Sequence, residues 1–309
     1  MKVLLATDGS AQAATALRTA ASLLRPKDAE LELLCVAPDF YFPQGKTPQE
    51  PQKAARMVEA YRQKIRLEAS GLLLHAQAAL AARGIKAGTR VEIGSPARVI
   101  TQLADGYDLV VVGAHDQYTR SKPGLGAVAS RVVAAAPGAV LIGRELGEES
   151  RQWRILLAVD GSLAAEEALE FLTASFRMSE AEITLMHVVE TPWVHLGLDR
   201  EWFDYEPGVT DLNGSPADRV LKNELQREGD TVIASARRKL ERHGLSVNTV
   251  IAEGDPALEI LSESERGEYD LIVIGATGEH DLKHQLLGGV STKVAQAALC
   301  SILVVKFNE

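Results

Sequence analysis

The stretch IGATGEHDLKHQLLGGVSTKVAQAALCSILVV, residues 274–305, contains two pairs of glycines. Gly275 and Gly278 stand at and just after the end of an apolar run, and Gly288 and Gly289 stand where a helical pattern begins. Short Val- and Ile-rich runs on either side of a helical pattern are typical of parallel strands that are buried on both faces. The stretch therefore predicts a strand, a glycine-bounded loop, a helix and a second strand.

The same arrangement occurs earlier in the chain, which indicates an internal duplication. VLLATDGS at 3–10 matches ILLAVDGS at 155–162, and YDLVVVGA at 107–114 matches YDLIVIGA at 269–276. The offset between the copies grows along the chain, as expected where insertions fall in loops. A polar stretch, GEESRQW at 147–153, separates the two copies.

Within each repeat, short apolar runs alternate with helical patterns. In the second repeat the apolar runs lie at 155–159, 183–188, 247–251, 271–275 and 302–306. This alternation predicts a parallel sheet with helices on both faces and right-handed crossovers. The predicted fold class is α/β, with two tandem doubly wound (Rossmann-like) domains at 1–146 and 153–309. Each domain is expected to contain a five-stranded parallel sheet flanked by helices.

Folds of this kind bind ligands at the carboxyl ends of the strands, at the topological switch point. Asp160 ends the first strand of the second repeat, where its carboxylate could bind a sugar hydroxyl or a base amino group. A turn or a helix cap is the alternative role for this side chain. Gly275 and Gly278 could let the backbone approach a ligand closely, or form a simple turn.

The start of the last helix is a second candidate segment. Gly288 and Gly289 lead into it, and Ser291 and Thr292 follow. The first amides of a helix form an anion site to which hydroxyl groups can add hydrogen bonds. A glycine-rich helix entry with a hydroxyl cap is the alternative. All candidates fall at one edge of the predicted sheet, which favours a ligand site.

The spacing Gly275-x2-Gly278-x9-Gly288 resembles the G-x2-G-x9-G-(S/T) ATP-binding motif of the universal stress protein family. The DGS turn, the HVV end of the second strand, the GDPALEI helix and the closing SILVVKF strand resemble the family too. Both repeats share these features, so the chain resembles a tandem universal stress protein.

The resemblance implies an ATP-binding stress-response regulator that holds ATP and Mg²⁺ in its second domain. Asp160 would contact the adenosine, and the backbone of Val188 would meet the adenine edge. The residues around the ribose and phosphates would be Gly275, Gly278, Gly288, Gly289 and Ser291. The family often has Ser or Thr at the position of Gly289, so this chain keeps the amide there but lacks the hydroxyl.

The first repeat keeps the motif's spacing and changes its chemistry, as Gly113-x2-Asp116-x9-Gly126. Asp116 places a carboxylate where a phosphate would lie, and Ala127 and Ala129 stand where hydroxyl groups are expected. We therefore predict that this domain is structural or holds another ligand, and that one nucleotide binds per chain.

Other patterns are less specific. His280, Asp281 and His284 could bind a metal, as could His115 beside Asp116, but a solvated polar turn is favoured and no metal site is predicted. The segments 190–211 and 38–45 hold seven of the 15 aromatic residues. They form a lid, a partner surface, or loops folded back on their own domains.

Charge and composition exclude several classes. The net charge is −9, with +3 in residues 1–150 and −12 in the rest, which argues against a nucleic-acid partner. No run approaches the ~18 apolar residues of a membrane span, and MKVLLATDGS is too short in apolar residues for a signal peptide. A cytoplasmic protein with no membrane partner is expected. Cys35 and Cys300 are expected to be buried rather than disulfide-bonded.

The chain lacks GxSxG, Walker A and HExxH motifs, so no catalytic residue is predicted and at most slow ATP hydrolysis is expected. The alternatives are a nucleotide-free interaction scaffold, a tandem protein that binds a metal or another small ligand, and, less favoured, an adenine-nucleotide-cleaving enzyme. The apolar final strands, GAVLIGRE and SILVVKF, predict that the repeats pack as an intrachain pseudo-dimer. A homodimer of whole chains is left open.

Overall fold

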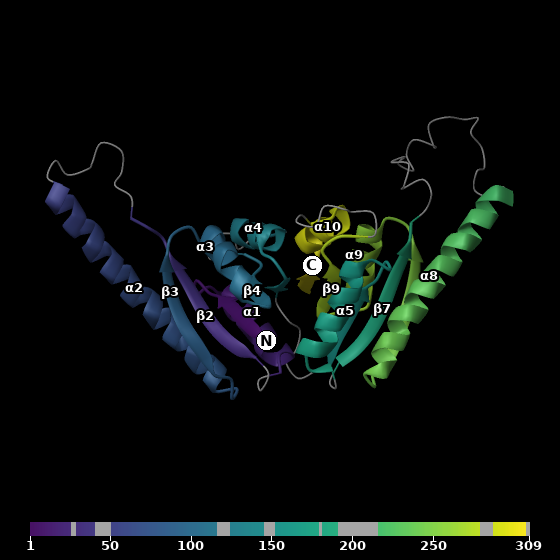
Figure 1. Ribbon diagram of the computed structural model, residues 1–309, viewed down its shortest axis with the longest axis horizontal. Coiled ribbons are helices and arrows are strands. Elements are labelled where there is room, and N and C mark those ends of the chain that lie inside the picture. The colour runs from purple at the N-terminus through teal and green to yellow at the C-terminus, as the bar shows by residue number, and fades with distance from the viewer. Residues whose placement is uncertain are drawn as a thin grey trace. The chain divides into compact units, whose positions relative to one another are not determined.

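A computed structural model describes residues 1–25, 29–40, 51–115, 124–144, 152–178, 181–190, 216–278 and 287–306, with only the backbone described for 216–222. The chain forms two compact units, which consist mainly of Met1–Gly147 and Glu148–Cys300 (Figure 1). The last strand is described below with the second unit, whose strand order it completes.

The first unit contains five strands in the order β3-β2-β1-β4-β5. They are β1 (Lys2–Ala6), β2 (Glu30–Ala37), β3 (Ala87–Ile93), β4 (Leu109–Gly113) and β5 (Ala139–Gly143). β1 pairs in parallel with β2 and β4, and β2 with β3 and β4 with β5 are parallel as well. The order reverses between β1 and β4, which is therefore the topological switch point.

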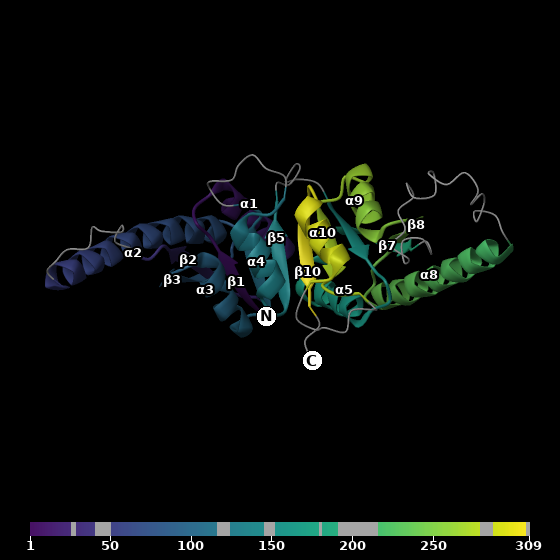
Figure 2. The same ribbon diagram turned by 90° about the horizontal axis from the view of Figure 1, so that it is seen from above.

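Helices cover both faces of this sheet. They are α1 (Ala11–Leu23), α2 (Pro51–Ala81), α3 (Pro96–Leu103) and α4 (Ala127–Ala135), with a 3-10 turn, η1, at Ala104–Gly106. Figure 2 shows α1 and α2 on one face and α3 and α4 on the other.

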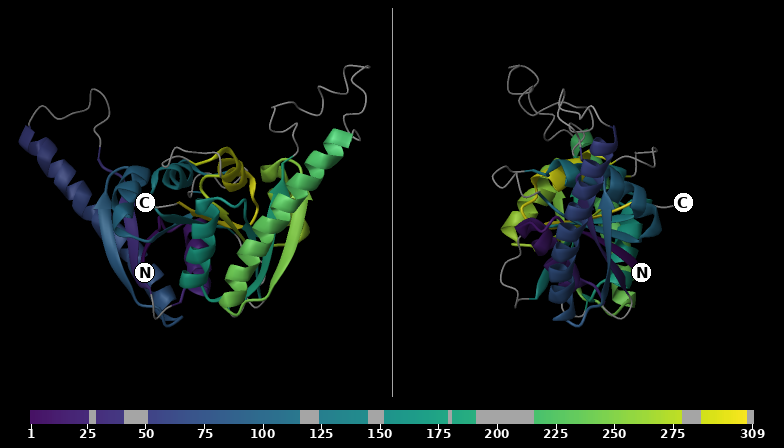
Figure 3. Two further views of the ribbon diagram at one scale, coloured as in Figure 1. Left: turned by 45° about the vertical axis from the view of Figure 1, so that its right-hand side comes forward. Right: turned by 90° about the vertical axis from the view of Figure 1, so that its left-hand side faces the viewer.

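The second unit repeats this topology, with strand order β10-β9-β6-β7-β8. Its strands are β6 (Trp153–Ala158), β7 (Ala181–Val189), β8 (Val247–Glu253), β9 (Leu271–Gly275) and β10 (Ser301–Val305). Its helices are α5 (Leu163–Ser175), α8 (Pro216–Arg242), α9 (Pro256–Arg266) and α10 (Gly289–Ala297). β6 pairs in parallel with β7 and β9, and the long helix α8 lies along β7 and β8 (Figure 3).

The central strands explain why both sequences fold this way. In β1, Val3 and Leu4 have no exposed surface, and in β9 the run Leu271–Val273 is equally buried. Consecutive side chains point to opposite faces of a strand, so burial of every residue requires a cover on both faces. The predicted α/β class and the two doubly wound domains are confirmed.

The turns that leave β1 and β6 show the duplication in detail. Ser10 caps α1 by accepting a hydrogen bond from the Ala13 amide at 3.1 Å, and Ser162 caps α5 in the same way from Ala165 at 3.1 Å. The glycine before each serine has a positive φ, 79° at Gly9 and 86° at Gly161. This left-handed conformation favours glycine, so DGS forms the same turn twice.

Among the described residues, no helix has the length and apolar composition that crossing a membrane requires.

Candidate functional site

The predicted site residues of the second unit lie at the carboxyl edge of its sheet. Asp160 follows β6, Val188 is near the end of β7, and Gly275 ends β9. Because β6 pairs with both β7 and β9, three separate parts of the sequence meet at this edge. The candidate site is therefore at the switch point, as predicted.

Asp160 uses its two carboxylate oxygens differently. Oδ1 accepts a hydrogen bond from the Ser162 amide at 3.0 Å, which fixes the DGS turn. Oδ2 faces the loop after β9, because a Cβ added at Gly278 would lie 3.0 Å from it. Both residues are exposed. The structure thus brings Asp160 and Gly278 together across 118 residues of sequence, with one carboxylate oxygen directed at the glycine.

Both ends of the glycine-bounded loop are anchored at Ala276. The Gly288 amide donates to the Ala276 carbonyl at 2.8 Å, and the Ser291 hydroxyl donates to the same carbonyl at 2.6 Å. The Ser162 hydroxyl lies 3.4 Å from the Thr277 carbonyl, which ties the loop to the DGS turn. These contacts hold the start of α10 beside the ends of β6 and β9. Residues 280, 281 and 284, which were considered as metal ligands but not predicted to be a metal site, lie outside the described residues.

The glycines of the motif have different packing environments. A Cβ at Gly275 would lie 2.7 Å from the carbonyl carbon of Ala164 and 2.8 Å from the Ala165 nitrogen. Helix α5 therefore packs directly on the end of β9, and glycine is needed there for packing alone. At Gly289 an added Cβ would meet nothing within 4 Å. Gly289 is exposed at the first position of α10, and packing gives no reason for a glycine there.

Ser291 is 2% exposed, and its hydroxyl bonds to the Ala276 and Gly288 carbonyls. The hydroxyl therefore stabilises the start of α10. As the first amides of the helix, the N–H groups of Gly289, Val290 and Ser291 have no carbonyl partner within it. A contact of Ser291 with a phosphate remains a prediction, because its hydroxyl is already bonded to these two carbonyls.

His187, next to Val188, was not singled out from the sequence. Its Nδ1 lies 2.8 Å from the Val159 carbonyl, so the ring connects the ends of β7 and β6 just before Asp160. The ring also packs on α8, where a Cβ at Gly229 would lie 2.8 Å from its Cδ2. Val188 is partly exposed and in register with Ala252 of β8. The sequence HVV at 187–189 could have indicated this contact, because a histidine near the end of a strand can form a hydrogen bond with the backbone of a neighbouring strand.

A second polar pair near the same edge was also missed. Asp255 caps α9 by accepting from the Leu258 amide at 3.0 Å, and the Lys293 ammonium of α10 lies 3.2 Å from its other oxygen. Desolvation acts to raise the pKa of Asp255, but the Leu258 amide and Lys293 outweigh it and the pKa is lowered. The charged pair links the N-terminal ends of α9 and α10.

The first unit has the same framework with other side chains. The Asp8 carboxylate accepts from the Ser10 amide at 2.9 Å, and the Gly126 amide donates to the Ala114 carbonyl at 2.8 Å. Cys35 takes the place of His187, and burial raises the pKa of its thiol, with the charge of Asp8 adding to the effect.

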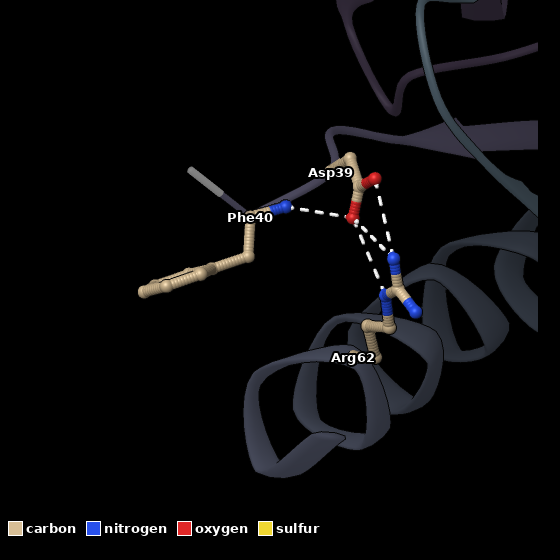
Figure 4. Close-up of polar contacts among 3 residues, drawn as sticks. All are labelled: Asp39, Phe40 and Arg62. Carbon is tan, nitrogen blue, oxygen red and sulfur yellow. Dashed lines mark hydrogen bonds and ion pairs between the residues drawn. The ribbon is translucent and has the colours of Figure 1, made fainter. Parts of the chain in front are cut away.

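The exit from β2 is fixed by an ion pair in this unit. The Arg62 guanidinium of α2 reaches both oxygens of Asp39, at 3.1 and 3.3 Å, and the Phe40 amide donates to Asp39 at 2.9 Å (Figure 4). The Phe40 ring packs on Tyr61 with 4.9 Å between the ring centroids. The Phe40 amide first, and Arg62 next, lower the pKa of Asp39. Other residues of the two aromatic segments, 41–45 and 191–211, lie outside the described part of the chain.

No group of three His, Cys, Asp or Glu side chains suited to a metal ion occurs within the described ranges. His115 is in the described part, but Asp116 is not. The predicted contrast between Asp116 and Gly278 therefore remains a prediction from the sequence.

The chain is a tandem α/β protein in which each half has a doubly wound sheet and a DGS turn at its carboxyl edge. A model of the universal stress protein family matches residues 1–144 and again 153–306. The chain belongs to the universal stress protein family.

The chain is also similar to individual proteins and solved structures. Universal stress protein YxiE of Bacillus subtilis is 30% identical over 155 residues, which is 50% of this chain and 98% of the relative. The crystal structure of a universal stress protein from Archaeoglobus fulgidus has a TM-score of 0.64 at 19% identity, and covers 99% of this chain and 98% of that one. A solved Arabidopsis thaliana family member with AMP bound has a TM-score of 0.34 at 20% identity, over 50% of this chain and 92% of its own. Two such domains in one chain fit a pseudo-dimer.

Proposed function

We propose that the second unit binds one adenine nucleotide, ATP with Mg²⁺, and that the protein acts as a nucleotide-dependent stress-response regulator. The family assignment fits a role in the stress response. In this proposal the first unit has the same fold and the same turns but does not bind the nucleotide.

The pairing of Asp160 with Gly278 carries the proposal. A Cβ at Gly278 would lie only 3.0 Å from Asp160 Oδ2, so any side chain there would crowd the carboxylate. A carboxylate in this position can accept hydrogen bonds from ribose hydroxyls, while Gly278 leaves room for the nucleotide beside it. Val188, partly exposed on the neighbouring strand, supplies backbone at the base end.

The phosphates of the nucleotide would bind at the start of α10. Its first amides and the helix dipole favour an anion, and Gly289 exposes the backbone there. The second half of the chain carries a net charge of −12. A nucleotide triphosphate would therefore depend on these local dipoles, on Lys293 at the same helix, and on Mg²⁺ to offset the surrounding negative charge.

Isothermal titration of the full chain with ATP and Mg²⁺ tests the proposal, with AMP as a second titrant. We expect one site per chain. Gly278→Asp should lower the affinity about 100-fold or more, because a carboxylate ~4 Å from a phosphate costs roughly 4 kcal/mol at an effective dielectric of ~20, less what solvent and Mg²⁺ screen. Gly278→Ala separates the steric part of the loss from the electrostatic part.

The matched pair of aspartates is the control. Asp160→Ala should weaken binding about tenfold, as expected for a lost charged hydrogen bond of ~1.5 kcal/mol, while Asp8→Ala in the first unit should leave binding unchanged. Two sites per chain, or equal effects of Asp8→Ala and Asp160→Ala, would contradict the assignment. Mass spectrometry of the nucleotide after long incubation measures any slow hydrolysis.

The arrangement of the two units is a separate proposal. Pairing of the apolar final strands would give an intrachain pseudo-dimer. It is supported by the strand composition and by the presence of two domains of one family. Separately expressed halves, 1–146 and 153–309, should then associate in sedimentation experiments, and two stable monomers would refute the pairing.

A further inference from the structure

His187 forms a hydrogen bond that connects two parts of the candidate site. Its Nδ1 lies 2.8 Å from the Val159 carbonyl oxygen. A carbonyl oxygen can only accept a hydrogen bond, so Nδ1 must carry the proton and donate it. The bond joins the residue before Asp160 to the residue before Val188. It therefore links the two positions that are expected to contact the sugar and the base.

Helix α8 has a glycine where the imidazole packs on it. Gly229 is buried, and a Cβ there would lie 2.8 Å from Cδ2 and 3.3 Å from Nε2 of His187. Glycine is unfavourable in the interior of a helix. The close approach of the ring explains why this position has a glycine, so His187 and Gly229 act as a pair.

The first unit shows that the fold does not require this pair. Helices α2 and α8 align at an offset of 160 residues, because Gly84 and Gly244 follow them with φ of 75° and 74°. The counterparts of His187 and Gly229 are then Cys35 and Ala69, and both are buried. One unit therefore combines a small side chain on the strand with alanine on the helix, and the other combines an imidazole with glycine.

The register of β7 shows where the backbone of Val188 points. The Met186 carbonyl accepts from the Val159 amide at 2.9 Å, on the side of β6. The Val189 carbonyl accepts from the Gly254 amide at 3.1 Å, on the side of β8. Successive residues of a strand direct their N–H and C=O to alternate sides, so both groups of Val188 point to the side of β6. The β6–β7 pairing ends at Met186, and Val188 thus presents a donor and an acceptor just beyond it.

We propose that His187 is a positioning residue that makes the site selective for adenine over a 6-oxopurine base, an inference that rests on the proposed function. Its bond to Val159 fixes the end of β7 against the end of β6. The spacing between the Val188 backbone and the Asp160 carboxylate is thereby fixed as well. An adenine edge offers an amino donor beside a ring-nitrogen acceptor, which match the Val188 carbonyl and amide. In hypoxanthine an oxo group replaces the amino group, so two acceptors would face each other.

The first unit supplies the design of a matched variant. His187→Cys combined with Gly229→Ala gives the second unit the two side chains that the first unit has at these positions. A thiol is only a weak hydrogen-bond donor, so the double variant lacks the strong bond to Val159. The fold already accommodates this combination once, so the thermal unfolding midpoint should stay close to that of the parent chain.

Titration of the full chain with ATP and with inosine triphosphate, each with Mg²⁺, measures the selectivity. We expect the parent to prefer ATP about tenfold, as one hydrogen bond at the 6-position implies. In the double variant the ATP affinity should fall about tenfold and the inosine triphosphate affinity less than about twofold, because only the bond to the amino group is lost. His187→Asn, whose amide nitrogen can take the place of Nδ1, should keep the preference. Cys35→Ala in the first unit should change neither affinity.

The parent chain and the double variant test different claims. A parent that binds neither nucleotide would contradict the proposed function on which the inference rests. A parent that binds ATP, with a double variant that keeps the full preference or loses both affinities equally, would overturn the role of His187 alone. Nitrogen NMR of the imidazole in the ligand-free chain checks the bond without any nucleotide. A proton on Nδ1 is expected, and a ring protonated only at Nε2 would overturn the inference.

Discussion

The two units share one framework and differ in the groups that it presents. Asp8 and Asp160 hold the same turn through the amide two residues on, and Gly126 and Gly288 donate to equivalent carbonyls. Contacts that recur in both units are explained by the fold itself. They are not evidence for a ligand in either unit.

The evidence for a ligand is in the positions that do not recur. Gly278, Gly289 and His187 have Asp116, Ala127 and Cys35 as their counterparts. Gly289 has open space around it, so packing does not explain that glycine, and the tight contact of a Cβ at Gly278 would be with the Asp160 carboxylate rather than with the backbone. Gly275 differs in this respect, because Gly113 occupies the same tight position in the first unit. Gly275 is therefore a weak indicator of nucleotide binding, and Gly288, which recurs as Gly126, is another.

The two units also differ in how α1 and α5 pack on their sheets. Gly143 at the end of β5 corresponds to Val305 at the end of β10, and each carbonyl accepts the equivalent amide, from Ala114 and Ala276. Helix α1 packs on both β4 and β5, whereas α5 packs mainly on β9. A Cβ at Gly143 would lie 2.2 Å from the Cα of Ala16. The position of the first helix over its sheet thus depends on this one glycine.

The largest effect should come from Gly143→Ala. The added Cβ meets backbone atoms of α1, which cannot rotate away, so the helix must shift as a whole. We expect a loss of about 3 kcal/mol or more in the free energy of unfolding, measured by urea denaturation. Gly106→Ala is the control because nothing lies within 4 Å of its added Cβ. If Gly143→Ala were as stable as this control, helix α1 would not be placed over β5 as described.

The next effect tests whether Gly275 serves packing or the nucleotide. Gly275→Ala and Gly113→Ala place a Cβ 2.7 and 2.9 Å from helix backbone in their respective units. Each should lower the free energy of unfolding by about 1–3 kcal/mol, as overpacking does. A stable Gly113→Ala beside an unstable Gly275→Ala would show that the two units pack differently at this point.

Much of this molecule could be predicted from the sequence. Continuous Val, Ile and Leu runs defined the strands because a doubly covered sheet has no polar face, and the duplicated DGS and YDL segments defined the two repeats. The meeting of Asp160 with the loop after β9 followed from the switch-point rule. The domain limits and the ligand roles of the site residues remain predictions.

Other features of the site could not be predicted from the sequence. The packing role of Gly275 depends on the height of α5 above the strand, which no local pattern encodes. The inward direction of the Ser291 hydroxyl depends on the position of the Ala276 carbonyl, fifteen residues away. The pairing of Asp255 with Lys293 joins two helices whose relative position is set by the sheet.

A smaller effect should follow from restoring a hydroxyl at the start of α10. Gly289→Ser fits without a clash, because an added Cβ meets nothing within 4 Å. Serine also costs roughly 0.5 kcal/mol less than glycine within a helix. We expect a gain of about that size in stability, and ATP affinity raised about two- to fivefold by one added hydrogen bond of ~0.5–1 kcal/mol. Ala127→Ser is the matched change in the first unit, and it should create no second site in the titration. A second site would show that hydroxyl loss alone separates the two units.

The smallest effect concerns Asp39, whose counterpart at the 152-residue offset is Thr191. The Phe40 amide and then Arg62 lower the pKa of Asp39 below its usual value of 3.8. A carboxyl whose pKa is lowered by folding stabilises the folded state above pH ~4, and this contribution disappears as the pH falls through the lowered pKa. In Arg62→Met the pKa of Asp39, followed by carboxyl NMR, should rise but stay below 3.8, because the Phe40 amide still donates. The free energy of unfolding should then fall less steeply as the pH is lowered below about 4. An unchanged pKa in Arg62→Met would mean that the ion pair of Figure 4 does not form in solution, and that the exit from β2 is held by the Phe40–Tyr61 ring contact.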